Sequence, residues 1–307
     1  MQLPCTLSWA GRIRARCCRL ARCCPIVSIV ALPVLLTAQA TETNVAVQFR
    51  LRDQYLIVVQ TVVNGEGPFP FVLDTGTSRT IVDPALAAKL HAPIVGNTSL
   101  SGMLRVREDK LVEIENIRLG AVSLSDMTAV VDKLSRQKML APGIRGVLGE
   151  DFLSRFDLLI DYKHRRLRFG GAIPVGERCR FETSGEYHGL PTTRRILIPV
   201  EFVEMNGLKV ALQLDSGAKA LELFPASVNS RSSPGWIRSI SAENSVDGTA
   251  VLPNATIRIG TMLFHGEDVV QSHRVLRFDA GGLLPAAIFR SIYISHSGGF
   301  IVLNPVE

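Results

Sequence analysis

The chain has 307 residues and a formal net charge of +6, but this charge is concentrated at the N-terminus. Residues 1–24 hold five arginines and no acidic residue, which leaves 29 of the 34 Lys and Arg against all 28 Asp and Glu in the rest. The near-neutral remainder gives no reason to expect a nucleic-acid partner. Five of the six cysteines also lie in this leader, so Cys179 has no partner for an internal disulfide.

The first 40 residues have the pattern of a secretory signal. The arginines precede an apolar run, PIVSIVALPVLLT, which is too short to cross a bilayer and ends near Ala38-Gln39-Ala40. We expect a signal peptide over residues 1–40 and export to the periplasm or the extracellular medium. The alternative is that the signal stays uncleaved and anchors the protein to the membrane. No membrane span is expected after signal removal.

The remaining residues favour many short strands and few helices. Runs rich in Val, Ile and Leu alternate with Gly, Pro, Asn and Asp, which is typical of an all-β protein. The clearest runs are VAVQFRL, YLIVVQTVV, LLIDY, ILIPVEFVEM and GFIVLN. Asp83-Pro84 is a suitable start for a short helix over ALAAKL, and Pro285 is a suitable start for another over PAAIFRSI.

Four sequence markers recur in the same order and at nearly the same spacing, which indicates an internal duplication. In each copy, Asn-Gly is followed by an apolar strand and by Asp-Thr-Gly or Asp-Ser-Gly, with the Asp 10 or 9 residues after the Asn. The paired markers are Asn64-Gly65 with Asn206-Gly207, Asp74-Thr75-Gly76 with Asp215-Ser216-Gly217, residues 117–120 with 257–260, and residues 146–149 with 282–285. We therefore expect two similar lobes, residues 41–176 and 177–307.

Duplication gives Asp74 and Asp215 a chemistry that one copy lacks. A single Asp-Thr-Gly is also a good turn, in which the carboxylate caps backbone amides. A pseudo-twofold axis, however, would bring the two carboxyls face to face, where they share a proton. The ionised member can then activate a water, and the protonated member can donate to the carbonyl that the water attacks. The residues expected to support the pair are Thr75, Gly76, Ser216 and Gly217.

These features resemble the bacterial retropepsin-like aspartic peptidases that carry both lobes on one chain. The segments that carry the resemblance are NGEGPFPFVLDTGTS, GVLGEDFLSRFDLLIDY, NGLKVALQLDSGA and, more loosely, GLLPAAIFRSIYI. The resemblance implies an all-β fold with a closed barrel in each lobe, and endopeptidase activity through Asp74 and Asp215. It also implies that Thr77 can donate a hydrogen bond to Asp74, whereas Ala218, its counterpart, cannot do so for Asp215.

The resulting hypothesis is an exported aspartic endopeptidase that acts on a peptide or protein substrate as a monomer. Neither a metal nor a cofactor is expected, because the six histidines lack metal-binding spacing. One alternative is a catalytically silent peptide-binding module of the same fold, in which Lys219 holds Asp215 permanently ionised. A second alternative is a structural β-domain whose aspartates only cap turns.

Overall fold

The structure is a computed structural model that describes residues 45–101, 106–134, 143–187, 190–224, 245–246, 249–271 and 280–306. Residues 42–307 form one compact unit, separate from residues 1–41. The predicted signal peptide lies outside the described residues. No helix in the described ranges is both long enough and apolar enough to cross a membrane.

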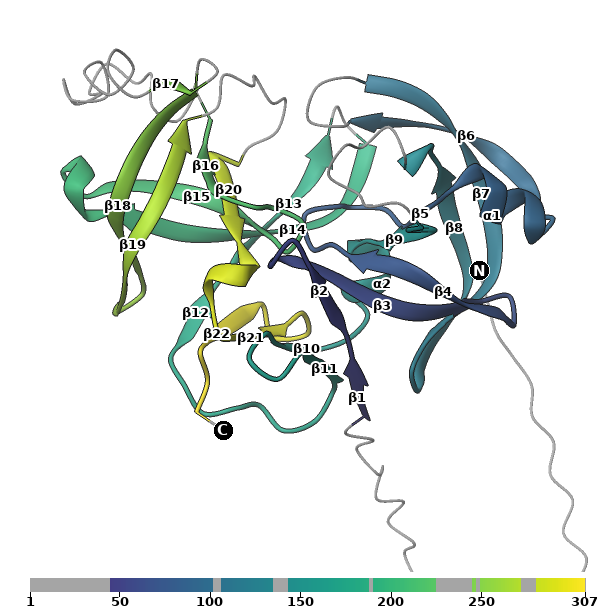
Figure 1. The fold of residues 1–307 in the computed structure, drawn as a ribbon, viewed down its shortest axis with the longest axis horizontal. Helices are drawn as coiled ribbons and strands as arrows, with labels where there is room; N and C mark the ends of the chain where they lie inside the picture. Colours follow the sequence, from purple (N-terminus) through teal and green to yellow (C-terminus); the bar gives the residue numbers. More distant parts are fainter. Residues whose placement is uncertain are drawn as a thin grey trace, which may run out of the picture. The chain divides into compact units, whose positions relative to one another are not determined.

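The first lobe is an eight-stranded sheet that closes into a barrel (Figure 1). Its strands, in sheet order, are β2 (Arg50–Arg52), β3 (Leu56–Val63), β4 (Glu66–Leu73), β9 (Gly146–Leu148), β5 (Ile81–Val82), β8 (Val122–Val131), β7 (Val106–Leu119) and β6 (Ile94–Ser101). An additional pairing of β3 with β7 joins Val62 to Arg118 and Val63 to Ile117. Strands β3, β4, β9, β5, β8 and β7 therefore form a closed ring.

The second lobe repeats this arrangement strand for strand. Its sheet order is β13 (Glu182–Tyr187), β14 (Leu190–Phe202), β15 (Leu208–Asp215), β20 (Gly282–Pro285), β16 (Leu221–Leu223), β19 (Met262–Gln271), β18 (Thr249–Ile259) and β17 (Ser245–Val246). The ring closes where Glu201 pairs with Arg258 and Phe202 with Ile257. The same two parallel pairings, β15 with β20 and β16 with β19, recur as in the first lobe. The predicted all-β fold of two similar closed lobes is confirmed.

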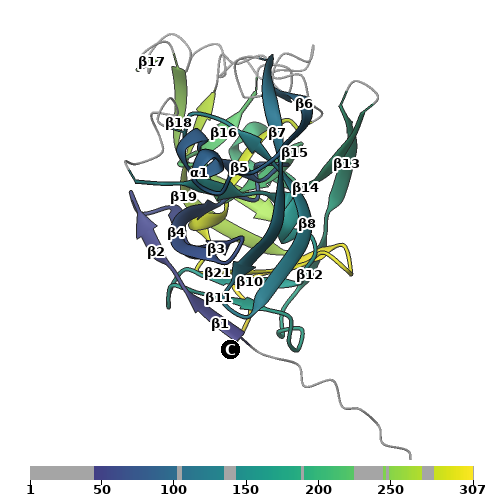
Figure 2. The ribbon, with the colours of Figure 1, turned by 90° about the vertical axis from the view of Figure 1, so that its right-hand side faces the viewer.

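A third sheet takes strands from both lobes. Its order is β1 (Val45–Gln48), β11 (Arg166–Phe169), β10 (Leu158–Asp161), β21 (Ser291–Ser295), β22 (Phe300–Leu303) and β12 (Arg178–Arg180). At its centre β10 and β21 pair antiparallel, from Leu158 with Ile294 to Asp161 with Ser291. This sheet lies on the same side of both barrels in two perpendicular views (Figures 1 and 2). The backbone hydrogen bonds of this sheet join the two lobes.

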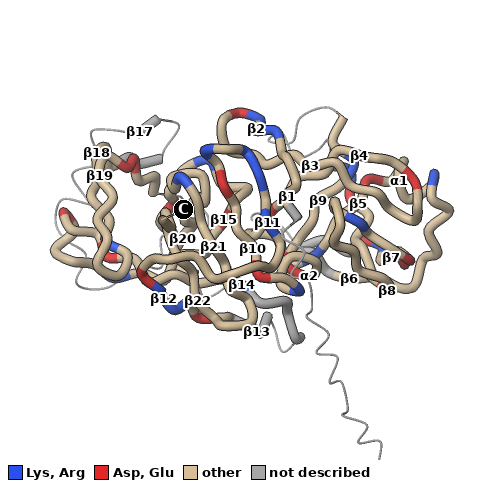
Figure 3. Tube along the Cα trace, turned by 90° about the horizontal axis from the view of Figure 1, so that it is seen from below, with Lys and Arg blue, Asp and Glu red and all other residues tan. Residues whose placement is uncertain are grey.

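Helices are few in the described residues, as expected. Helix α1 (Pro84–Lys89) begins after Asp83, whose side chain accepts a hydrogen bond from the Leu86 amide, as predicted for its N-cap. The other short elements are α2 (Glu150–Leu153), η2 (Val203–Met205) and η3 (Ala286–Ile288). Figure 3 shows basic and acidic positions interspersed along the described chain.

One local expectation was wrong. The segment after Pro285 forms only the single 3₁₀ turn η3, because Phe289 is already extended and β21 begins at Ser291 to pair with β10. The lone cysteine outside the leader belongs to the shared sheet. Cys179 lies in β12, pairs with Ile301 and is buried.

The close packing of the barrels explains the repeated glycine at the start of β9 and β20. A Cβ on Gly146 would lie 2.1 Å from the Phe71 ring, and one on Gly282 would lie 1.9 Å from the Glu222 carbonyl oxygen. Phe71 lies in β4, which pairs with β9 up to the Asp74 loop, and Glu222 lies in β16, which pairs with β20 on the edge opposite β15. A side chain at either glycine would therefore push β9 or β20 out of the sheet that supports the aspartates.

Candidate active site

Asp74 and Asp215 occupy equivalent places at the ends of β4 and β15. The Asp74 amide donates to the Leu148 carbonyl, which continues the β4–β9 pairing into the loop. Each carboxylate then accepts a hydrogen bond from the glycine two residues on, at 2.8 Å from Gly76 N to Asp74 Oδ1 and 2.7 Å from Gly217 N to Asp215 Oδ1. Strand and turn together fix where each carboxyl lies.

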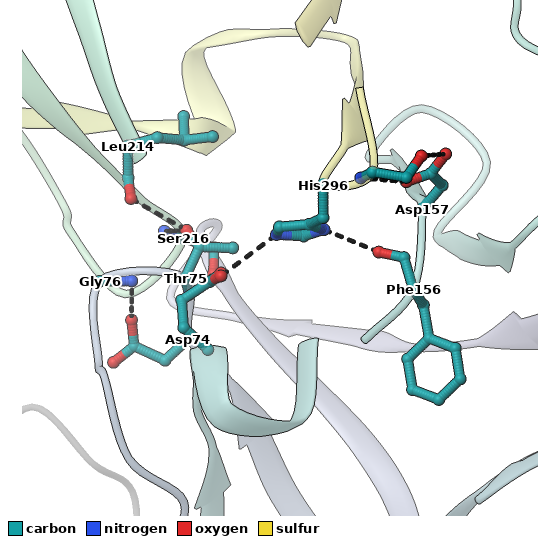
Figure 4. A network of polar contacts seen from close by, with 10 residues as sticks. Asp74, Thr75, Gly76, Phe156, Asp157, Leu214, Ser216 and His296 are labelled. Atoms are coloured by element: carbon teal, nitrogen blue, oxygen red, sulfur yellow. Dashed lines mark hydrogen bonds and ion pairs between the residues drawn. The ribbon is translucent and has the colours of Figure 1, made fainter. Parts of the chain in front are cut away.

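Thr75 and Ser216 connect the two loops reciprocally (Figure 4). Each backbone amide donates to the other residue's hydroxyl at 3.0 Å. Each hydroxyl in turn donates to the strand opposite, from Thr75 to the Leu214 carbonyl at 3.1 Å and from Ser216 to the Leu73 carbonyl at 2.9 Å. Both side chains are buried, and every donor has an acceptor. These buried hydrogen bonds join the two loops.

The glycines bring the carboxyl of one lobe against the backbone of the other. A Cβ on Gly76 would lie 2.3 Å from Asp215 Cγ, and a Cβ on Gly217 would lie 2.9 Å from Asp74 Oδ2. The two carboxyls are therefore neighbours. Ionising both would place two negative charges side by side, so the pair favours a state in which one member is protonated.

The electrostatics of the pair favour a proton on Asp215. Burial and the adjacent Asp74 carboxyl raise the pKa of Asp215 well above its ordinary value. Asp74, in contrast, accepts a second hydrogen bond at Oδ2, 2.7 Å from Thr77 Oγ1. Ala218 offers no such donor at the equivalent position, and Lys219 is exposed. The two carboxyls are thus alike in position but unlike in their hydrogen bonds.

Gln213 was missed by the sequence analysis, although a signal was available. It is the polar residue near the end of the apolar strand LKVALQLD, and strand alternation puts it on the same face as Asp215. Its side chain is buried, and its Nε2 donates to the Gly76 carbonyl at 2.7 Å. The equivalent residue of the first lobe, Val72, has no donor, so only the Asp74 loop receives this support.

A second cluster lies under the first loop, in helix α2. The Glu150 amide donates to the Thr77 carbonyl at 2.8 Å, and both Asp151 oxygens accept from Thr80, at 2.9 Å from its amide and 2.7 Å from its hydroxyl. The Glu150 side chain contacts His296 of the other lobe, with 3.1 Å between Oε2 and Nε2. Among the described residues, no group of three or more His, Cys, Asp or Glu side chains could hold a metal ion.

A comparison with family models places part of the chain among known proteins. A model described as aspartyl protease matches residues 59–152, which run from β3 through the Asp74 loop to α2. The resemblance found in the sequence is thereby confirmed for the first lobe. A search of curated proteins returned no match.

Proposed function

Because residues 59–152 match a family model described as aspartyl protease, we propose that this chain is an exported aspartic endopeptidase with Asp74 and Asp215 as its catalytic pair. The observation that carries the proposal is the approach of the two carboxyls, each of which lies against the glycine of the opposite loop. Both aspartates lie on one chain, so the site needs no second copy. Export rests on the signal-like pattern of residues 1–40.

The mechanism follows from the unequal hydrogen bonding of the two carboxyls. Asp74, supported by Gly76 and Thr77, is the ionised member and removes a proton from a water held between the pair. Asp215 is the protonated member and donates to the carbonyl oxygen of the peptide bond as the water attacks its carbon. The resulting tetrahedral intermediate collapses when the amine leaves with the proton taken up by Asp74, and Asp215 recovers its proton from the intermediate's hydroxyl.

The two alternatives receive less support. A silent module required Lys219 to neutralise Asp215, but the Lys219 side chain is exposed. A structural domain with capped turns requires only the hydrogen bonds within each loop. It gives no reason for the reciprocal bonds between Thr75 and Ser216, which bring two carboxyls together at an electrostatic cost.

The test is cleavage of a mixed peptide library by the mature protein and by Asp74→Asn and Asp215→Asn. Each variant loses the group that takes or gives a proton, so kcat/KM should fall by at least about 100-fold, the low end for general acid–base groups. Asp126→Asn is a matched control, because Asp126 is exposed in β8. Wild-type cleavage by either site variant would disprove the assignment, and no cleavage by the wild type between about pH 3 and 8 would disprove the function.

A further inference from the structure

The contact between Glu150 and His296 is a buried link between the lobes. Glu150 begins α2 of the first lobe, and His296 lies in the turn from β21 to β22 of the second. Glu150 is fully buried, and His296 is 7% exposed. The imidazole lies between two acceptors. Its Nδ1 is 2.7 Å from the Phe156 carbonyl oxygen (Figure 4), and its Nε2 is 3.1 Å from Glu150 Oε2.

The hydrogen-bond chemistry of the contact requires one shared proton. A carbonyl oxygen only accepts, so Nδ1 carries a proton and donates it to Phe156. Nε2 and Oε2 can then bond only if one further proton lies between them, either as an imidazolium with a carboxylate or as an imidazole with a carboxylic acid. Glu150 Oε1 has no hydrogen-bond partner among the described residues. His296 therefore provides the hydrogen bond that compensates the buried carboxyl.

The backbone of Glu150 is hydrogen-bonded to the loop that carries Asp74. The Glu150 amide donates to the Thr77 carbonyl, and the Thr77 hydroxyl donates to Asp74 Oδ2. At the preceding residue, a Cβ on Gly149 would lie 2.6 Å from the Arg79 carbonyl, so α2 lies directly against this loop. If Glu150 moved, its hydrogen bond to the Thr77 carbonyl would change, and the Thr77 hydroxyl would no longer be held against Asp74.

The charges around the pair are predominantly acidic. The charges of Asp74 and Asp151 raise the pKa of Glu150, and the charge of Asp157 raises the pKa of His296. Burial is the largest cause of the raised pKa of Glu150. For His296 burial is the largest single cause and lowers the pKa, but the hydrogen bond and charge of Glu150, the Phe156 carbonyl and the Asp157 charge together outweigh it and raise the pKa. Both shifts favour retention of the shared proton, because its loss would add a negative charge among these carboxylates.

We propose that Glu150 and His296 are a positioning pair, which shares one proton between the lobes and thereby holds α2 and the Thr77 hydroxyl in place against Asp74. The kinetic part of this inference rests on the proposed function. The pair itself does not, because it makes a prediction about stability that needs no peptide cleavage.

The kinetic test compares His296→Leu with Glu150→Gln. His296→Leu removes the bond, so Thr77 is no longer fixed. The acidic limb of the kcat/KM profile should move to higher pH by about one unit, since a hydrogen bond to a charged group contributes roughly 1.5–3 kcal/mol. In Glu150→Gln the amide can donate to neutral Nε2, so the limb should not move upward. The matched control is His164→Gln, which removes a His–carboxylate contact of 2.8 Å to Asp161 that does not join the two lobes.

The stability test follows Tm against pH for the wild type and Glu150→Gln. The folded pair keeps its proton to higher pH than the unfolded chain does, so the wild type should lose stability as pH rises above about 6.5, the ordinary His value. Glu150→Gln should lose less stability over this range. If the Tm of Glu150→Gln followed that of the wild type in parallel over this pH range, the two residues would share no proton. This comparison can be made even if His296→Leu does not fold. The positioning role would be overturned if His296→Leu folded and kept the wild-type acidic limb of kcat/KM. It would also be overturned if the limb moved as far in Glu150→Gln as in His296→Leu. Absence of any wild-type cleavage would count against the proposed function alone.

Discussion

The two aspartates differ in their side-chain donors. Asp74 and Asp215 each accept from the amide of the following glycine, but only Asp74 also accepts from a hydroxyl, that of Thr77, because the equivalent residue beside Asp215 is Ala218. One hydroxyl is thus enough to break the symmetry of a duplicated site. The pair can divide the roles of base and acid before any substrate binds.

Thr77→Val tests this asymmetry, because valine keeps the shape of threonine and lacks the hydroxyl. With one donor fewer at Asp74, the ionised pair is less favourable, and the acidic limb of kcat/KM should move to higher pH by about one to two units. The measurement is the pH profile of peptide cleavage. Lys219→Ala is the control and should leave the limb unmoved. A shift in Lys219→Ala with none in Thr77→Val would reverse the assignment of base and acid.

The elements that position the site are hairpins, and the sequence markers coincide with their turns. Asn-Gly occupies the β3–β4 and β14–β15 connections, where left-handed backbone is needed. The φ values are 49° and 76° at Asn64 and Gly65, and 53° and 70° at Asn206 and Gly207. The repeat was visible in the sequence because residues with positive φ tolerate few replacements.

Other features of the site had no local signal. Glu150 and His296 are far apart in the sequence and belong to no repeated marker, since the second lobe has Ala286 where the first has Glu150. The pairing of β10 with β21 likewise depends on strands from different lobes. Contacts of this kind are set by packing of the whole chain, so a single sequence predicts the barrels and the aspartates but not the connections between them.

At the level of the loops, Ser216→Ala should destabilise the fold as well as the site. The change removes the acceptor of the buried Thr75 amide and the donor to the Leu73 carbonyl. An unsatisfied buried group costs about 1–3 kcal/mol, so the free energy of unfolding in urea should fall by that amount. Ser216→Thr is the control, because threonine occupies the matching position in the first lobe. An unchanged urea midpoint in Ser216→Ala would show that the reciprocal bonds contribute little.

At the scale of the whole molecule, Asp157 of the first lobe is hydrogen-bonded to the second lobe. Its carboxylate accepts from the Ser297 amide and hydroxyl at 3.0 and 2.9 Å, from the Ser295 hydroxyl at 3.1 Å and from the Tyr293 hydroxyl at 3.3 Å. Partial burial alone would raise the pKa of Asp157, but the hydrogen bonds from Ser297 and Ser295 outweigh it and lower the pKa. The charged form is therefore the one that the folded state favours.

Asp157→Asn should lower Tm at neutral pH, and the difference from the wild type should disappear in acid. A group with a lowered pKa contributes stability above its ordinary value of about 4, and this contribution is lost as pH falls through the folded-state value. Calorimetry of both proteins from neutral pH to about pH 3 measures the effect. Asp126→Asn, an exposed change, should show no such trend. A Tm difference that is independent of pH would assign Asp157 a packing role instead.

The sheet shared by the lobes also determines the order in which the molecule can fold. Strand β11 follows β10 directly and covers one of its edges, but the other edge is covered by β21, with Leu158 opposite Ile294. Pairing over so long a separation is slow, because the intervening chain must first be ordered. Until residues 291–295 arrive, the apolar strand β10 presents an open edge on which another chain can pair. A chain in which β21 has not yet paired with β10 is therefore prone to aggregate at this edge.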